Sequence, residues 1–297
     1  MDSAEFGNDS TMAYRVFRPA EQRVPYVFNS PHSGRAYPQS FLKASKLSSL
    51  DIRRSEDLYV DKLFAGVVEL GAPLLAAEFP RAWLDVNREP YELDPKLFGK
   101  DLPAHANTRS MRVAGGLGTI PRLVSETLEI YQQKPTLEQA LWRIENVYRP
   151  YHETLRGLVA RSSVMFGHAI LVDCHSMPSC GSRSDKQSRP DIIVGDRYGI
   201  SCNGDISRAI MRRFSELGYS VSRNKPYAGG FITEHYGRPL KGLHSVQIEI
   251  NRGLYVDEQT LEPSAGFQAL VEDIRTVMSH VISIPDSGFY AEPLAAE

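Results

Sequence analysis

The chain has 297 residues, of which 42% are hydrophobic and 24% are charged, and its formal net charge is −2 with histidine neutral. This composition is typical of a globular protein with a substantial core, and it predicts one domain over residues 15–285 with tails at 1–14 and 286–297. Lysine and arginine are scattered along the chain, which argues against nucleic acid or a membrane surface as the main partner.

The sequence favours a cytoplasmic protein. No apolar run approaches the ~20 residues of a membrane helix, and the polar, acidic first ten residues do not resemble a signal peptide. Cys174, Cys180 and Cys202 are few and odd in number, which predicts reduced thiols rather than a disulfide framework.

The elements expected in the first half begin with a buried strand at 24–28, followed by a loop that contains His32. Apolar residues at helical spacing predict a helix over 55–70 that ends at Gly71. Strands are expected at 73–77 and 83–87, and residues 88–122 are expected to be irregular.

In the second half, Thr136 and Gln139 form a predicted capping box at the start of a long helix, which Pro150 is expected to interrupt. The remaining expected elements are a strand at 169–174, a polar loop at 176–190, a strand at 191–194, a helix at 204–217, strands at 219–223 and 244–250, and a helix at 267–282. This alternation predicts an α/β fold with a largely parallel sheet flanked by helices.

Two histidines follow expected strands directly. His32 comes after the strand at 24–28, and His175 comes after the strand at 169–174. Because loops at the carboxyl ends of strands line the ligand crevice of an open α/β sheet, the two imidazoles are expected to meet there. Two histidines and one carboxylate can form a three-ligand zinc site, which Asp173 would help to orient.

The acidic ligand is expected from Glu56 or Asp57, and we favour Asp57 because Asp61, one turn further, would extend an acidic face. Carboxylates at a helix start are also favourable without any metal. Glu249 lies on the polar face of the strand at 244–250, where burial would raise its pKa and suit it as a general base. The alternative for Glu249 is a solvated sheet face.

Asn87 and Arg88 follow the strand expected at 83–87, and an arginine beside an asparagine can grip a substrate carboxylate. The alternative for Arg88 is a surface salt bridge with Glu89 or Glu92. Arg112 is the next candidate for holding the carboxylate. The pattern disfavours Cys174 as a nucleophile, because the neighbouring side chains of Cys174 and His175 on a strand point in opposite directions.

The chain resembles the N-formylglutamate amidohydrolase family over about residues 24–282. The resemblance is carried by six ordered blocks: Asn29–Gly34, Glu56-Asp57, Leu84–Arg88, Asp173–Met177, Gly229–Gly237, and Gln247–Glu249 with Leu254–Glu258. It implies a three-layer α/β/α fold with a mixed, mostly parallel sheet like that of the zinc carboxypeptidases and aspartoacylase, in the phosphorylase/hydrolase-like class.

The same resemblance implies one Zn²⁺ ion per chain and hydrolysis of N-formyl-L-glutamate, or a similar small N-acyl amino acid, to formate and the free amino acid. It makes His32 and His175 zinc ligands, Glu249 the base, and Asn87-Arg88 the carboxylate clamp, with His235 as a further substrate contact. Arg35 stands where carboxypeptidases have an acidic ligand, so that ligand must come from elsewhere, as Asp57 or Glu56.

The sequence is also compatible with two functions other than a zinc amidohydrolase. A metal-free binding protein of the same fold would show the loss of a ligand or of the base. A thiol hydrolase using Cys174 would resist a chelator and be inactivated by a thiol alkylator. The sequence leaves the oligomeric state open.

Overall fold

The computed structural model describes residues 13–99, 101–125, 127–179 and 189–284. Cys180, most of both predicted tails, and most of the polar loop predicted at 176–190 lie outside these ranges. The chain divides into two compact units, which we describe separately. The first comprises Met1–Arg15, Pro31–Asp57 and Ala76–Leu155, and the second comprises Val16–Ser30, Leu58–Leu75 and Arg156–Glu297. The single domain expected at 15–285 stays a prediction.

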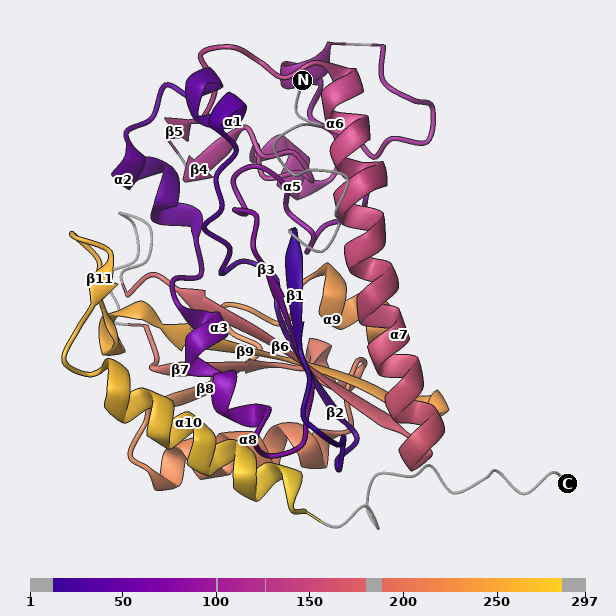
Figure 1. The fold of residues 1–297 in the computed structure, drawn as a ribbon, viewed down its shortest axis with the longest axis vertical. Helices are drawn as coiled ribbons and strands as arrows, with labels where there is room; N and C mark the ends of the chain where they lie inside the picture. Colours follow the sequence, from indigo (N-terminus) through magenta and orange to yellow (C-terminus); the bar gives the residue numbers. More distant parts are fainter. Residues whose placement is uncertain (1–12, 100, 126, 180–188, 285–297) are drawn as a thin grey trace, which may run out of the picture. The chain divides into compact units, whose positions relative to one another are not determined.

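The described residues contain a seven-stranded sheet with the strand order β1-β3-β2-β6-β9-β7-β8 (Figure 1). Its strands are β1 (Tyr14–Phe17), β2 (Tyr26–Ser30), β3 (Leu74–Ala77), β6 (Ala169–Met177), β7 (Ile192–Gly195), β8 (Val221–Arg223) and β9 (Leu243–Asn251). The pairs β2–β6, β6–β9 and β7–β8 are parallel, whereas β7 runs antiparallel to β9. This mixed, mostly parallel sheet with its helices confirms the predicted α/β class.

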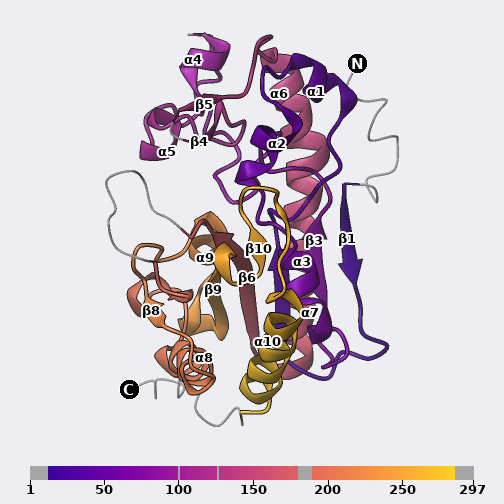
Figure 2. The same ribbon diagram turned by 90° about the vertical axis from the view of Figure 1, so that its left-hand side faces the viewer.

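One face of the central strands is apolar. Because successive residues of a strand point to opposite faces, Ile170, Val172 and Cys174 of β6 share a face, and they pack in one buried cluster with the helices of the second unit. These helices are α3 (Val60–Leu63), α8 (Gly204–Glu216) and α10 (Phe267–Ile282). Figure 2 shows α8 and α10 side by side below the strands. The helix predicted at 267–282 is confirmed, and these residues of it are buried: Leu270, Ile274, Val277 and Val281.

The opposite face of β6 and β9 is polar and still buried. It presents Asp173 and His175 from β6, and Gln247 and Glu249 from β9, all less than 9% exposed. Helix α9 (Phe231–Tyr236) packs against both strands. β9 lies between β6 and β7, so it is a central strand, and its burial on both faces excludes a solvated face for Glu249.

The first unit is mostly irregular and is built around short helices. They are α1 (Gln39–Ala44), α2 (Ser49–Ile52), α4 (Pro95–Phe98), α5 (Met111–Ala114) and α6 (Leu137–Arg143). The capping box of Thr136 and Gln139 is confirmed. After α6, a π-helical segment at Ile144–Tyr148 leads into α7 (Arg149–Phe166), so the expected interruption lies just before Pro150. The short strand pairs are β4 (Leu123–Ser125) with β5 (Leu128–Glu129) and β10 (Val256–Asp257) with β11 (Glu262–Pro263), the latter in the second unit.

The helix predicted over 55–70 is wrong. The structure has only α3, with 3-10 turns at Arg53–Ser55 and Ala65–Val67. Tyr59 has a φ of 58°, a left-handed conformation that a continuous helix does not allow. Glu56 and Asp57 therefore lie in a turn before α3 and do not open a helix, although Gly71 ends the segment at a φ of 95° as expected.

The strand predicted at 83–87 is also wrong. Trp83 and Leu84 donate their backbone N–H groups to the carbonyl of Pro80, which forms a turn, and Asp85 N–H donates to the Thr119 carbonyl. Among the described residues of 88–122, the expected irregular structure is confirmed apart from the single turns of α4 and α5. No helix among the described residues is long and apolar enough to cross a membrane.

Candidate active site

His32 and Asp57 meet in the first unit. Asp57 N–H donates to the His32 carbonyl at 2.9 Å, and His32 Nδ1 lies 3.3 Å from Asp57 Oδ2, with both side chains 1% exposed. The His32 loop is fixed against the segment after β3, because a Cβ on Gly34 would lie 2.1 Å from the Phe79 carbonyl oxygen. Only glycine fits this close approach, so the small residues around His32 have a structural reason.

Asp85 orients the His32 ring from its other side. His32 Nε2 lies 2.8 Å from Asp85 Oδ1, and the same carboxylate accepts from Asn87 N–H at 2.9 Å and from Arg81 Nε at 3.0 Å. Burial would raise the pKa of Asp85, but Arg88 and Arg81, followed by His32, hold this pKa well below its usual range. An ionised carboxylate only accepts hydrogen bonds, so Asp85 favours a proton on Nε2 and makes Nδ1, on the side of Asp57, the nitrogen available to a metal ion.

His175 has an equivalent arrangement in the second unit. His175 Nε2 lies 2.9 Å from Asp173 Oδ2, and Asn29 Nδ2 donates to Asp173 Oδ1 at 2.7 Å. The sequence placed His175 in a loop after its strand. It lies instead within β6, because the β6–β9 ladder continues as far as Met177 and Asn251. The role expected for Asp173 in orienting a site residue fits this contact.

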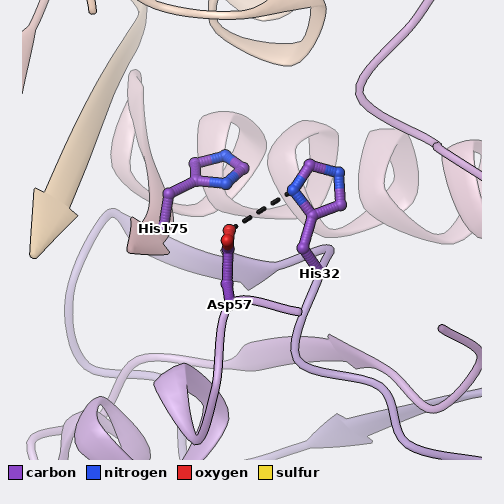
Figure 3. Close-up of side chains that lie close together, drawn as sticks. All are labelled: His32, Asp57 and His175. Carbon is purple, nitrogen blue, oxygen red and sulfur yellow. Dashed lines mark ion pairs between the residues drawn. The ribbon is translucent and has the colours of Figure 1, made fainter. Parts of the chain in front are cut away.

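His32, Asp57 and His175 form a group that could hold a metal ion (Figure 3). Each offers one ligand atom, and these atoms all lie within 4.8 Å of one another. Ligands on a tetrahedral zinc ion at about 2.0–2.1 Å are roughly 3.3 Å apart, which equals the 3.3 Å separation of His32 Nδ1 and Asp57 Oδ2. Two imidazoles and a carboxylate are also a donor set that zinc prefers, so the residues fit a zinc ion.

Glu56 is engaged elsewhere. The hydroxyl of Tyr37 donates to Glu56 Oε1 at 2.7 Å, and Arg53 Nε donates to the same oxygen at 3.2 Å. Burial raises the pKa of Glu56, although Tyr37 and Arg53 lower it. The geometry therefore favours Asp57 over Glu56 as the acidic ligand, in agreement with the preference drawn from the sequence.

Glu249 lies beside His175. The two residues are paired across the parallel β6–β9 ladder, so their side chains leave the same face of the sheet. Gln247 Nε2 donates to Glu249 Oε1 at 2.8 Å, and Gln247 Oε1 in turn accepts from the Gly230 N–H at 2.8 Å. These bonds fix one carboxylate oxygen of a side chain that is 8% exposed. The raised pKa of Glu249 stays a prediction.

Arg88 is buried and forms no surface salt bridge with Glu89 or Glu92, so that alternative is wrong. Its Nη2 lies 3.2 Å from Asp85 Oδ2, while Nε donates to the Leu117 carbonyl and Nη1 to the Asn87 carbonyl, both at 2.7 Å. Burial lowers the pKa of Arg88 to about 10, against the effect of Asp85, and the group remains cationic at neutral pH. Arg112 Nη1 donates to the same Asn87 carbonyl at 3.3 Å.

The other sequence candidates are less well supported. His235 is exposed on α9, where its ring stacks on Phe231 with 5.0 Å between centroids. The Cys174 thiol is fully buried in the apolar cluster, and burial, followed by Asp173, raises its pKa well above the usual value. A thiolate nucleophile is therefore disfavoured. The sequence did not single out Asp85 and Arg81, although Asp85 belongs to the Leu84–Arg88 block.

The chain is similar to known proteins over most of its length. Residues 24–256 match the family model of N-formylglutamate amidohydrolase. N-formylglutamate deformylase from Pseudomonas aeruginosa is 28% identical over 263 residues, covering 88% of this chain and 92% of the relative. The deformylase from Pseudomonas putida is 27% identical over 263 residues, with 88% and 91% covered.

Solved structures give the same result. The crystal structure of N-formylglutamate amidohydrolase from Ralstonia eutropha JMP134 superposes with a TM-score of 0.86 at 32% identity, covering 91% of this chain and 98% of that one. A gene product from Agrobacterium tumefaciens, at a TM-score of 0.64 and 19% identity over 93% of this chain and 98% of that one, shares the fold. The chain belongs to the N-formylglutamate amidohydrolase family.

Proposed function

We propose that this protein is a zinc-dependent N-formylglutamate deformylase, which hydrolyses the formamide bond of N-formyl-L-glutamate to formate and L-glutamate. The observation that carries the proposal is the buried group of His32, Asp57 and His175, in a chain whose relatives are named for this activity. Each histidine has an aspartate on its second ring nitrogen, as metal-ligating histidines usually do. The chain would act on a small molecule in the cytoplasm and bind one zinc ion.

His32, Asp57 and His175 would hold the zinc ion, and three protein ligands are the number typical of catalytic zinc sites. When bound there, zinc supplies a Lewis acid for the formyl oxygen and lowers the pKa of water to ~7. Glu249 takes a proton from the attacking water and delivers it to the amine nitrogen as the C–N bond breaks, so that the water oxygen ends in formate. Gln247 orients the Glu249 carboxylate by donating a hydrogen bond to its Oε1.

Asn87 and Arg88 bind a carboxylate of the substrate in this proposal. Arg88 has five N–H donors, and three contacts use Nε, Nη1 and Nη2 once each. One donor on each terminal nitrogen therefore remains for a ligand. Those three contacts hold the guanidinium in place before substrate arrives, which reduces the entropy lost on binding. Arg112 and His235 are further candidate substrate contacts.

The two rival functions have less support. A decayed, metal-free relative would have lost a ligand or the base, whereas His32, Asp57, His175 and Glu249 are all present and buried. The burial of Cys174 disfavours the thiol hydrolase. An amidohydrolase for another N-acyl amino acid uses the same chemistry, so only a substrate panel separates it.

The test is formate release from a panel of N-formyl and N-acetyl amino acids, measured for protein stripped with a chelator and for the same protein with Zn²⁺ restored. We expect N-formyl-L-glutamate to be the best substrate, and the stripped protein to regain activity with zinc. Activity that survives chelation and is lost on thiol alkylation would support the thiol hydrolase. Zinc-restored protein that releases formate from no member of the panel would refute the deformylase.

A further inference from the structure

The side chains of Arg88 and Arg112 converge on one oxygen atom. Arg88 Nη1 donates to the Asn87 carbonyl at 2.7 Å and Arg112 Nη1 donates to it at 3.3 Å, so the two nitrogens lie at most about 6 Å apart. The positive charge of Arg112 acts on Arg88, where it adds to the effect of burial in lowering the pKa. Two like charges held this close favour a ligand that carries negative charge.

Only one of the two cations has a carboxylate beside it. Asp85 Oδ2 lies 3.2 Å from Arg88 Nη2, whereas in the part of the chain that the structure describes no carboxylate lies within ion-pairing distance of Arg112. Burial raises the pKa of Glu92, and the charge of Arg112 lowers it from beyond ion-pairing distance. The charge of Arg112 is therefore left for a ligand.

The segment at 110–117 carries Arg112 and also contacts Arg88, so it fixes the positions of both side chains. The Ser110 hydroxyl accepts from the Val113 N–H at 3.1 Å and caps α5, and the Leu117 N–H donates to the Arg112 carbonyl at 2.7 Å. Leu117 then offers its own carbonyl to Arg88 Nε. The bond from Arg112 to Asn87, at 3.3 Å, is longer than a typical N–H···O bond. A weak contact of this kind is easily exchanged for a ligand carboxylate.

We propose that Arg112 binds the side-chain carboxylate of the substrate, while Arg88 with Asn87 binds its α-carboxylate. The site would then select N-acyl derivatives of acidic amino acids. In an extended glutamate skeleton the two carboxyl carbons are about 5 Å apart, and in aspartate about 4 Å, from C–C bonds of about 1.5 Å. This inference rests on the proposed function, since it assigns the two carboxylates of that substrate.

The test compares Arg112→Gln with the wild type on N-formyl-L-glutamate and N-formyl-L-glutamine, which differ only in the charge of the side chain. We expect kcat/KM for the glutamate derivative to fall roughly tenfold or more, mainly through KM, because a charge-assisted contact is lost. The glutamine derivative should lose less than about threefold. Arg112→Lys, which keeps the charge, should retain an intermediate preference for the glutamate derivative.

Arg109→Gln is the matched control. Arg109 is exposed, lies three residues before Arg112 and carries the same charge, so its loss reproduces any long-range electrostatic effect. We expect it to change neither substrate by more than about twofold. Equal losses for both substrates in Arg112→Gln, or a loss matched by Arg109→Gln, would overturn the proposal. A similar unfolding temperature for the variants and wild type would exclude general destabilisation.

The proposal can fail independently of the deformylase activity. If zinc-restored wild type releases formate from neither compound, calorimetric binding of L-glutamate and L-glutamine to it still tests Arg112. We expect Arg112→Gln to weaken L-glutamate by roughly tenfold and L-glutamine much less. No difference between the two ligands, in wild type or variant, would show that Arg112 does not read the side-chain charge.

Discussion

Asp85 joins His32 to the arginine cluster: Asp85 Oδ1 lies 2.8 Å from His32 Nε2, and Oδ2 lies within 3.2 Å of Arg88 Nη2 and 3.0 Å of Arg81 Nε. One carboxylate thus orients a candidate metal ligand and one half of the candidate substrate clamp. His32 and Asp85 are 53 residues apart in the chain. Ligand geometry and substrate binding therefore depend on the same buried group.

Asp85→Asn should weaken zinc binding by about 10- to 100-fold, the usual effect of changing a residue that orients a metal ligand. An amide can present its NH₂ group to His32 Nε2 and so favour the tautomer whose Nδ1 is protonated and cannot bind zinc. The measurement is the zinc dissociation constant by competition with a chromophoric chelator. An unchanged constant would show that Asp85 does not orient His32.

His32→Ala and His175→Ala should each lose zinc while the protein stays folded, because two remaining ligands hold the ion poorly. Zinc content after gel filtration, together with circular dichroism, gives both readouts. His105→Ala is the control, since His105 is exposed and its ring contacts only Tyr91 among the aromatic neighbours described. Full zinc occupancy in either ligand variant would remove that histidine from the site.

The two adjacent acids give a sharper test. Asp57→Ala should lose zinc, whereas Glu56→Gln should keep it, since Glu56 is bound to Tyr37 and Arg53. Glu56→Gln is expected to lower the free energy of unfolding by about 1–3 kcal/mol, because it weakens the charge-assisted bonds of a buried group. The reverse pattern of zinc contents would make Glu56 the ligand.

Glu249→Gln should keep its zinc and its substrate affinity and lose kcat by about 10²–10⁴-fold, the usual contribution of a general base. Glutamine has nearly the same shape as glutamate and cannot accept a proton at neutral pH. Glu234→Gln, an exposed change in the same unit, is the control. A kcat that remains at about a third of the wild-type value would indicate a structural role for Glu249.

The elements that could be predicted from the sequence are those in which burial imposes a regular pattern of apolar residues. α10 buries one face, so its apolar residues repeat at the period of a helix. β6 and β9 are buried on both faces and are recognised by the apolar run at 169–172 and by the alternation of polar and apolar residues at 244–250. The segments around Asp57 and Asp85 have no such period. Their conformations depend on bonds to distant residues, from Asp57 N–H to the His32 carbonyl and from Asp85 N–H to the Thr119 carbonyl. Local propensity cannot report such contacts.

The same distinction applies to the site. His32, His175 and Glu249 were found because each stands at or near the end of a predicted strand, and Asp57 because it is one of two adjacent acids. Asp85 and Arg81 act through contacts with residues far along the chain or across a turn. Only a folded structure shows which of the scattered arginines gather around one carboxylate.

The last prediction concerns Arg88. Arg88→Lys keeps the charge but loses the planar two-point contact with a carboxylate, as well as the bonds to the carbonyls of Leu117 and Asn87. Disrupting a buried charge-assisted contact costs roughly 2–5 kcal/mol. We therefore expect kcat/KM for N-formyl-L-glutamate to fall well over tenfold.

An analogue with an α-carboxamide in place of the α-carboxylate shows whether Arg88 binds the substrate or only supports the fold. Arg88→Lys should affect this neutral analogue much less, since the contact that the mutation removes is already missing. Measuring both substrates on both enzymes gives a double-mutant cycle, in which a coupling energy well above zero supports the clamp. If the two losses simply add, Arg88 supports the fold around Asn87 and Asp85, and the α-carboxylate is bound by another residue.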